Sequence, residues 1–137
     1  MSHESLTHRA APVAGLVYGP FGREHGPVVE LAWRGSFLAW EVSALHAEGF
    51  EGEGPERDWW ATVEQHSLGW VTARRRDKGL VGFVNVAWDG AEHAFLLDTV
   101  VAVGFRRDGI GASLVRRAVE GPVRRGAVGC TSTLKII

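Results

Sequence analysis

The sequence is poor in cysteine and has almost no net charge. Its 137 residues include one cysteine, Cys130, which excludes an internal disulfide and suits a reducing cytoplasm. Fifteen lysines and arginines stand against 16 aspartates and glutamates, whereas nucleic-acid binding usually needs a basic excess. The six histidines show no metal-ligand spacing. We therefore expect neither a nucleic-acid partner nor a metal site.

Long apolar runs are also lacking. No run approaches the roughly 20 residues of a transmembrane helix, and Met1–Arg9 is too polar for a signal peptide. We therefore expect a cytoplasmic protein that does not contact a membrane. The apolar content of 45% is that of an ordinary globular protein, and the length suits a single domain over residues 1–137, with residues 1–11 flexible.

The stretch Leu97–Glu120 changes its character twice. It begins as an apolar run rich in β-branched residues and then passes through Arg106–Gly111. The segment that follows places apolar residues at helical spacing. These residues are Leu114, Val115, Ala118 and Val119. The order predicts a strand, a glycine turn and a helix, and we expect the helix to end where Gly121-Pro122 interrupts it.

Such a junction favours binding of an anion. The first amides of a helix have no intrahelical partner, and the helix dipole adds partial positive charge there. Gly109 and Gly111 lack a Cβ, so a phosphate can approach the backbone closely. Arg106 and Arg107 add fixed positive charge. A glycine pair can be only a tight turn, but the arginines favour the phosphate interpretation.

The same residues carry a family resemblance. Arg106-x-x-Gly109-x-Gly111 resembles the (Arg/Gln)-x-x-Gly-x-(Gly/Ala) signature of the GNAT superfamily of acyl-CoA N-acyltransferases, and Asp98-Thr-Val-Val-Ala resembles its central strand. The resemblance covers roughly residues 13–135. It implies an α/β (α+β) fold with a mixed, mainly antiparallel sheet flanked by helices. It also implies an N-acetyltransferase that moves an acetyl group from acetyl-CoA to a primary amine by direct transfer.

The resemblance further implies a cofactor site. The backbone around Val101 and Val103 would bind the pantetheine arm, and the amides of the signature would bind the pyrophosphate. The signature residues are Arg106, Arg107, Asp108, Gly109, Ile110, Gly111 and Ala112. The acceptor would be the amine of a small molecule or peptide.

Hydrophobic alternation and turn residues predict the other elements. Gly82 indicates a bulge or a close contact, and Ser36 is expected to cap the first helix. The expected strands are Val13–Tyr18, Val28–Trp33, Gly69–Arg74, Leu80–Trp88, Glu92–Val101 and Ala127–Ile137. The expected helices end near Gly49 and at His66, the second beginning at Pro55.

These two helices and their loop are acidic and rich in tryptophan. One interpretation is a pair of helices whose acidic side chains are only solvated. The other is an acidic entrance to a pocket for a cationic amine, with Trp40, Trp59 and Trp60 at its rim. Each of these tryptophans could instead belong to the core. The acids are Glu41, Glu48, Glu51, Glu53, Glu56 and Asp58. The basic run Arg74–Arg76 similarly admits a nucleic-acid patch, but a charged hairpin end is favoured.

Acyl transfer to an amine needs a base. Alternation places Asp98 on one sheet face with Ala94, Leu96 and Val100, and His93 on the other. Asp98, nearest to the signature, is the candidate catalytic residue; the alternative is a carboxylate that only hydrogen-bonds within the sheet. Cys130 is a better candidate for a buried thiol than for a nucleophile.

The chain after the predicted helix is shorter than in the family, which normally continues with another helix and two strands. That portion often holds a tyrosine as general acid, whereas the single tyrosine here, Tyr18, lies near the other end. We expect a homodimer to cover the apolar edge of the last strand. The alternative function is a non-catalytic acyl-CoA-binding or interaction module.

Overall fold

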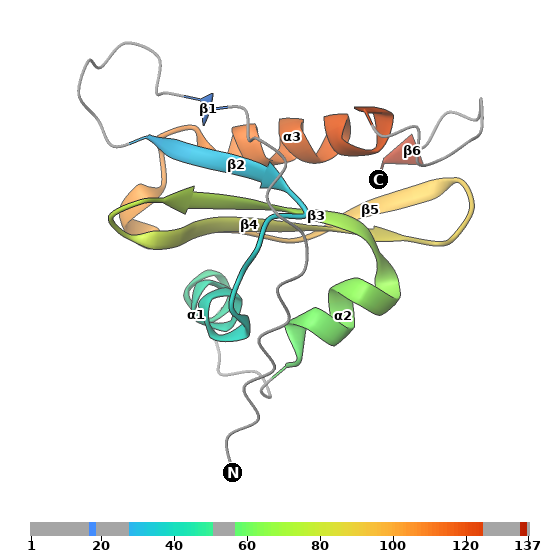
Figure 1. The fold of residues 1–137 in the computed structure, drawn as a ribbon, viewed down its shortest axis with the longest axis horizontal. Helices are drawn as coiled ribbons and strands as arrows, with labels where there is room; N and C mark the ends of the chain where they lie inside the picture. The colour runs from blue at the N-terminus through green and yellow to red at the C-terminus, as the bar shows by residue number, and fades with distance from the viewer. Residues whose placement is uncertain (1–16, 19–27, 51–56, 125–134, 137) are drawn as a thin grey trace.

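A computed structural model of the chain describes residues 17–18, 28–50, 57–124 and 135–136 (Figure 1). These residues form a six-stranded sheet and three α-helices. The strands are β1 (Val17–Tyr18), β2 (Val29–Trp33), β3 (Ser67–Arg75), β4 (Gly79–Trp88), β5 (His93–Val101) and β6 (Lys135–Ile136). The helices are α1 (Ala39–Gly49), α2 (Trp59–His66) and α3 (Ile110–Arg124). The other parts of the predicted strands Val13–Tyr18 and Ala127–Ile137 lie outside the described residues.

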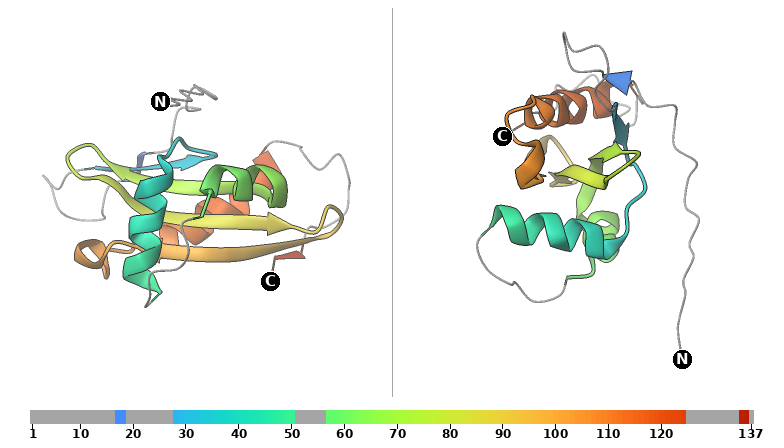
Figure 2. Two further views of the ribbon diagram at one scale, coloured as in Figure 1. Left: turned by 90° about the horizontal axis from the view of Figure 1, so that it is seen from below. Right: turned by 90° about the vertical axis from the view of Figure 1, so that its left-hand side faces the viewer.

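The sheet is mixed and mainly antiparallel, which confirms the predicted fold class. Its strands lie in sequence order from β1 to β6. Every neighbouring pair is antiparallel except β5 and β6, which run parallel with His93 opposite Lys135. Helix α3 covers one face, and α1 and α2 cover the other (Figures 1 and 2). No helix in these ranges is long and apolar enough to cross a membrane.

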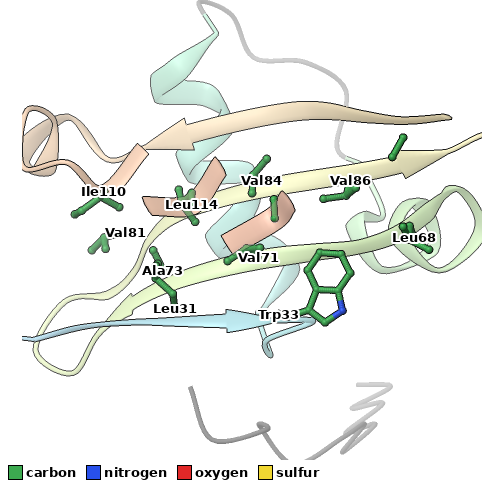
Figure 3. Close-up of a cluster of buried hydrophobic side chains, with 12 residues drawn as sticks. Leu31, Trp33, Leu68, Val71, Ala73, Val81, Val84, Val86, Ile110 and Leu114 are labelled. Atoms are coloured by element: carbon green, nitrogen blue, oxygen red, sulfur yellow. The ribbon is translucent and has the colours of Figure 1, made fainter. Parts of the chain in front are cut away.

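Each face of the sheet has its own apolar cluster. The cluster under α3 is built from strand residues and the inward side of the helix (Figure 3). Its fully buried members include Leu31, Val71, Val84, Val86 and Leu114. The opposite cluster joins α1 and α2 to the sheet through Phe37, Val42, Val63, Phe83 and Val100. A Cβ on Gly82 would lie 2.9 Å from Leu114 Cδ1, which confirms the predicted close contact.

The first two helices begin later than the sequence predicts. Leu38, not Ser36, is the N-cap of α1, and the Glu41 carboxylate accepts a hydrogen bond from the Leu38 amide at 2.9 Å. Phe37, buried and stacked on Trp60 with ring centroids 4.2 Å apart, fixes the chain just before the helix. A glutamate at the third helical position therefore does the capping that was expected of a serine.

Helix α2 begins at Trp59, and Arg57 and Asp58 before it are not helical, so the expected start at Pro55 is wrong. Pro55 itself lies outside the described residues. The N-cap of α2 is Asp58, whose side chain accepts a hydrogen bond from the Ala61 amide at 3.0 Å. Aspartate is a strong N-cap because its carboxylate satisfies an amide of the first turn. The predicted ends of both helices, near Gly49 and at His66, are confirmed.

Helix α3 continues to Arg124 through the Gly121-Pro122 pair, so the expected end at Glu120 is wrong. Pro122 costs the helix one backbone hydrogen bond, a local penalty. The gain is tertiary: a Cβ on Gly121 would lie 2.6 Å from Cζ3 of Trp33, so only glycine lets the helix backbone reach that ring. Packing against the sheet therefore outweighs the local helix-breaking signal.

Candidate functional site

The end of β5 leads through a tight turn into α3, as the sequence predicts. A short 3-10 helix, Val103–Phe105, is followed by a turn in which Arg107 has φ 71° and Gly109 has φ 79°. These left-handed conformations turn the chain sharply into the helix. The first backbone bond of α3 that closes a helical turn runs from the Ser113 N–H to the Gly109 carbonyl at 3.1 Å. The preceding amides, from Ile110 to Ala112, have no intrahelical acceptor.

The start of α3 fits a phosphate. A Cβ on Gly111 would make only an ordinary contact, 3.7 Å from Val101 Cγ2, and one on Gly109 would meet nothing within 4 Å. Space therefore remains beside Gly109 and Gly111, at the helix end where the dipole favours negative charge. Arg106, Arg107 and Asp108 are exposed around the turn. The structure thus brings the predicted signature residues together at one helix end.

Val101 and Val103, the predicted pantetheine contacts, already have partners within the chain. The Val101 carbonyl accepts a hydrogen bond from Arg106 Nε at 3.0 Å. The Val103 amide donates to Glu48 Oε2 at 3.0 Å, and Arg106 also reaches the Glu48 carbonyl at 3.4 Å. The end of α1 is therefore fastened to the turn that follows β5.

A bulge interrupts β5 next to this turn. Phe83 pairs with Val100 and Asn85 with Leu97, so one residue of β4 stands opposite two of β5. Asp98, one of these two, has φ 52°. The bulge reverses the alternation: Ala94 packs under α3, whereas Val100 belongs to the cluster under α1 and α2.

The predicted face assignment around Asp98 is therefore wrong. Alternation without a bulge would have placed Asp98, Ala94 and Val100 on one face. In the structure Asp98 bonds to a residue of α1, on the face opposite to Ala94. A single residue in the left-handed region shifts the pairing by one, and hydrophobic periodicity does not reveal such a residue.

The partner of Asp98 is His46, which the sequence analysis missed. His46 Nε2 lies 3.2 Å from Asp98 Oδ1, and the two side chains are 27% and 18% exposed. The imidazole packs against Phe50 and Trp59, with ring centroids 4.5 and 5.3 Å away. Trp59 is itself fixed, because its Nε1 donates to Ser43 Oγ at 3.0 Å. No local signal could have paired residues 52 positions apart.

Glu41 fits neither the solvated-helix nor the acidic-mouth interpretation. It is buried and accepts two hydrogen bonds from the Arg74 guanidinium, both at 2.8 Å. Burial acts to raise the pKa of Glu41, but the hydrogen bonds from Arg74 and the Leu38 amide outweigh it and leave the pKa below its usual value. The bond to Glu41 raises the pKa of Arg74. The pair fixes α1 to β3.

The other acidic and aromatic residues separate into different environments. Glu48 bonds to Val103 and Asp58 caps α2, whereas Glu51, Glu53 and Glu56 lie outside the described residues. Trp59 is buried and Trp60 is stacked on Phe37, so both belong to the core side. Trp40 is 67% exposed. The predicted aromatic rim is thus reduced to Trp40.

The charged hairpin end lies beside the turn after β5, because Arg75 Cζ is 4.7 Å from the ring centroid of Phe105. Arg75 pairs with Asp77 in the β3–β4 turn at 2.6 Å, as a charged hairpin end should. The remaining candidates lie away from this site. His93 bonds to Asp89 at 2.8 Å at the far end of β5. Three backbone and side-chain bonds, led by that from the Ala91 amide, lower the pKa of Asp89 to about 2. Cys130 lies outside the described residues.

Comparison with known proteins gives a consistent result. Residues 28–135 match the model of the acetyltransferase (GNAT) family. A GNAT family acetyltransferase from Streptococcus pneumoniae is similar in structure, with a TM-score of 0.56 and 19% identity over 79% of this chain and 72% of that one. Comparison with curated protein sequences gave no significant match.

Two structures from Escherichia coli share the fold. The GNAT family N-acetyltransferase YhbS, solved in complex with CoA, has a TM-score of 0.59 and 16% identity over 76% of this chain and 62% of that one. The ribosomal-protein-S18-alanine N-acetyltransferase has a TM-score of 0.54 and 16% identity over 72% of this chain and 61% of that one. At these identities the likeness concerns the fold.

Proposed function

Because the chain belongs to the GNAT acetyltransferase family, we propose that it moves an acetyl group from acetyl-CoA to a primary amine by direct transfer. The observation that carries the proposal is the start of α3. Its three open amides follow a glycine turn with two exposed arginines. Such a group binds phosphate oxygens. The similar YhbS structure, which contains CoA, supports acetyl-CoA as the donor.

The amides of Ile110, Gly111 and Ala112 would hold the pyrophosphate of acetyl-CoA, with Arg106 and Arg107 beside it. Asp108 can take part through its backbone N–H, because its exposed carboxylate is free to turn to solvent. Gly111 leaves the approach open. Bound acetyl-CoA supplies the acetyl group as a thioester. The Val103 amide becomes available to the pantetheine arm when Glu48 releases it.

Asp98 would serve the acceptor side of the reaction. It lies at the bulge of the same strand that leads to the phosphate site, with its carboxylate toward α1. A carboxylate at this point attracts a protonated amine. The acceptor class is a small-molecule or peptide amine. The expected homodimer remains a prediction, since the structure describes one chain.

Thiol release from acetyl-CoA in the presence of different amines tests the proposal. The panel contains spermidine, kanamycin, lysine and a peptide with a free N-terminus, and a reaction without amine measures hydrolysis. We expect at least one amine to raise the rate well above hydrolysis and to yield the N-acetylated product by mass spectrometry. Stabilisation by acetyl-CoA without transfer to any amine would instead indicate the non-catalytic acyl-CoA-binding module.

A further inference from the structure

The pair formed by His46 and Asp98 connects α1 to the bulge in β5. Its two atoms are 3.2 Å apart, and both side chains remain partly open to solvent. Phe50 and Trp59 hold the imidazole ring from α1 and α2. Figure 2 shows α1 crossing β4 and β5. The contact with Asp98 places His46 next to the bulge. A histidine is therefore held in a fixed orientation beside the candidate catalytic carboxylate.

The contact determines which nitrogen of His46 carries the proton. An ionised carboxylate only accepts hydrogen bonds, so Nε2 must donate to Asp98. In the neutral ring the lone pair then lies on Nδ1. No residue in the described ranges hydrogen-bonds to Nδ1. This nitrogen is therefore able to accept a proton.

We infer that His46 is the general base of the acetyl transfer and that Asp98 is the positioning residue that holds its ring. The inference rests on the proposed acetyltransferase function. An imidazole suits the task because one nitrogen can be held by a carboxylate while the other accepts a proton.

The location agrees with the rest of the site. Val101 lies three positions after Asp98, which is roughly 10 Å along a strand. Beyond Val101 the chain turns into the α3 amides that would hold the pyrophosphate. A cofactor arm that starts at those amides and follows β5 would carry its thioester toward the bulge. His46 then lies on the side from which an amine enters beside α1.

The transfer step balances with these groups. The protonated amine first gives a proton to His46 Nδ1, which frees the nitrogen lone pair, and Asp98 stabilises the imidazolium through Nε2–H. The neutral nitrogen then forms a bond to the thioester carbonyl carbon, and the carbon–sulfur bond breaks with its electron pair going to sulfur. The nitrogen loses its second proton to the thiolate, and His46 returns the first proton to solvent. The products are the N-acetylated amine and free CoA.

The surroundings of His46 contain few charges. Asp98 faces it from β5, while β4 contributes the apolar Leu80 and Phe83 to the cluster beneath α1. From α2 the neutral ring of Trp59 faces it, and Arg57 lies over that ring, 4.8 Å from its centroid. Arg106 and Glu48 are placed at the end of α1. Asp98 is thus the charged group that bonds to the imidazole.

The test compares His46→Gln and Asp98→Asn with wild type, using the panel amine that gives the fastest thiol release. Asparagine tolerates the left-handed conformation of residue 98, so the bulge should persist. The matched controls are His93→Gln and Asp89→Asn, which remove a similar but distant histidine–aspartate pair. We expect His46→Gln to lower kcat about 100-fold or more and to flatten the pH profile of kcat/KM, while acetyl-CoA still raises the melting temperature.

A second readout does not depend on activity. Nitrogen NMR of histidine side chains should show neutral His46 protonated at Nε2, and Asp98→Asn should weaken that preference. Wild-type kcat and pH profile in His46→Gln, or a neutral ring protonated at Nδ1, would overturn the role of His46 alone. A wild-type protein that releases no thiol with any amine would overturn the proposed function together with this role.

Discussion

The ring of Trp33 occupies the space in which a side chain at Gly121 would begin. A Cβ there would lie 2.6 Å from Cζ3 of the ring, and a Cβ on Gly69 would lie 2.6 Å from Cη2. Carbon atoms that are not bonded to each other do not approach so closely. The indole is therefore held between the backbones of β3 and α3, and two glycines provide the space for it.

Gly121→Ala should consequently destabilise the protein. The added methyl group must displace the Trp33 ring or the end of α3, and overpacking of this kind typically costs about 1–3 kcal/mol. Denaturant unfolding measures the change. Gly104→Ala is the control, because a Cβ at residue 104 would meet nothing within 4 Å. Equal stability of the two variants would contradict the close packing at Gly121.

The Glu41–Arg74 pair should make stability depend on pH. The pKa of Glu41 is lowered in the folded state, so the pair contributes fully above the ordinary value of 4.5, and its contribution is lost as pH falls toward the lowered folded pKa. Glu41→Gln should abolish this decrease in stability at low pH. At pH 7 it should lower the free energy of unfolding by about 1–3 kcal/mol, because it weakens buried hydrogen bonds. Unfolding curves at several pH values measure both effects.

Asp77→Asn is the matched control for this pair. Asp77 also bonds to an arginine, Arg75, and its pKa is also lowered, first by that bond, but it lies on the surface. Exposed ion pairs contribute little to stability. A Glu41→Gln variant as stable as Asp77→Asn, with unchanged pH dependence, would show that the contact between α1 and β3 does not need the ion pair.

Acetyl-CoA should raise the melting temperature, because a ligand that binds only the folded state stabilises it by mass action. Gly111→Leu should abolish the shift by placing a side chain beside the α3 amides, where only Val101 lies nearby. Ala44→Leu, at an exposed position of α1, controls for a leucine on a helix surface. A full shift in Gly111→Leu would remove these amides from the cofactor site.

Glu48→Ala should strengthen binding of acetyl-CoA several-fold. Glu48 now holds the Val103 amide, and its negative charge also opposes an anionic ligand. Titration calorimetry compares the dissociation constants of the variant and the wild type. Glu92→Ala removes an exposed carboxylate at the other end of β5 and should leave binding unchanged. Weaker binding in Glu48→Ala would mean that the contact supports the site instead of competing for it.

The turn and helix start that we propose to bind phosphate could be predicted from the sequence as local structure, because their signals are local. Arg106, Gly109 and Gly111 stand within six residues, and the alternation before them predicts a strand. Gly82 likewise indicated a bulge or a close contact, and in the structure α3 makes such a contact through Leu114. Such patterns report backbone conformation directly, since glycine and periodicity act over a few residues.

The arrangement around Asp98, which we propose to serve the acceptor, could not be predicted in this way. The bulge depends on one aspartate in the left-handed region, and the pairing of Asp98 with His46 needs α1 to lie across β5. In the sequence Glu41 looks like a surface carboxylate in an acidic segment. Only the fold brings Arg74 of β3 next to it. These contacts follow from tertiary packing, which overrides the local pattern.

The order of the strands has a consequence for folding kinetics. Strands β3, β4 and β5 form two consecutive hairpins, so their pairing closes short loops. Strand β2 pairs with β3 across α1 and α2, and β6 pairs with β5 across α3, so these pairings close longer loops. Contacts between residues close in sequence form faster. We expect the three strands β3, β4 and β5 to form the folding nucleus. In a mutational analysis of folding rates, Val84 should then give a high kinetic φ-value and Trp33 a low one. Asp98 would then be in place early, and the chain would gain its histidine partner when α1 docks.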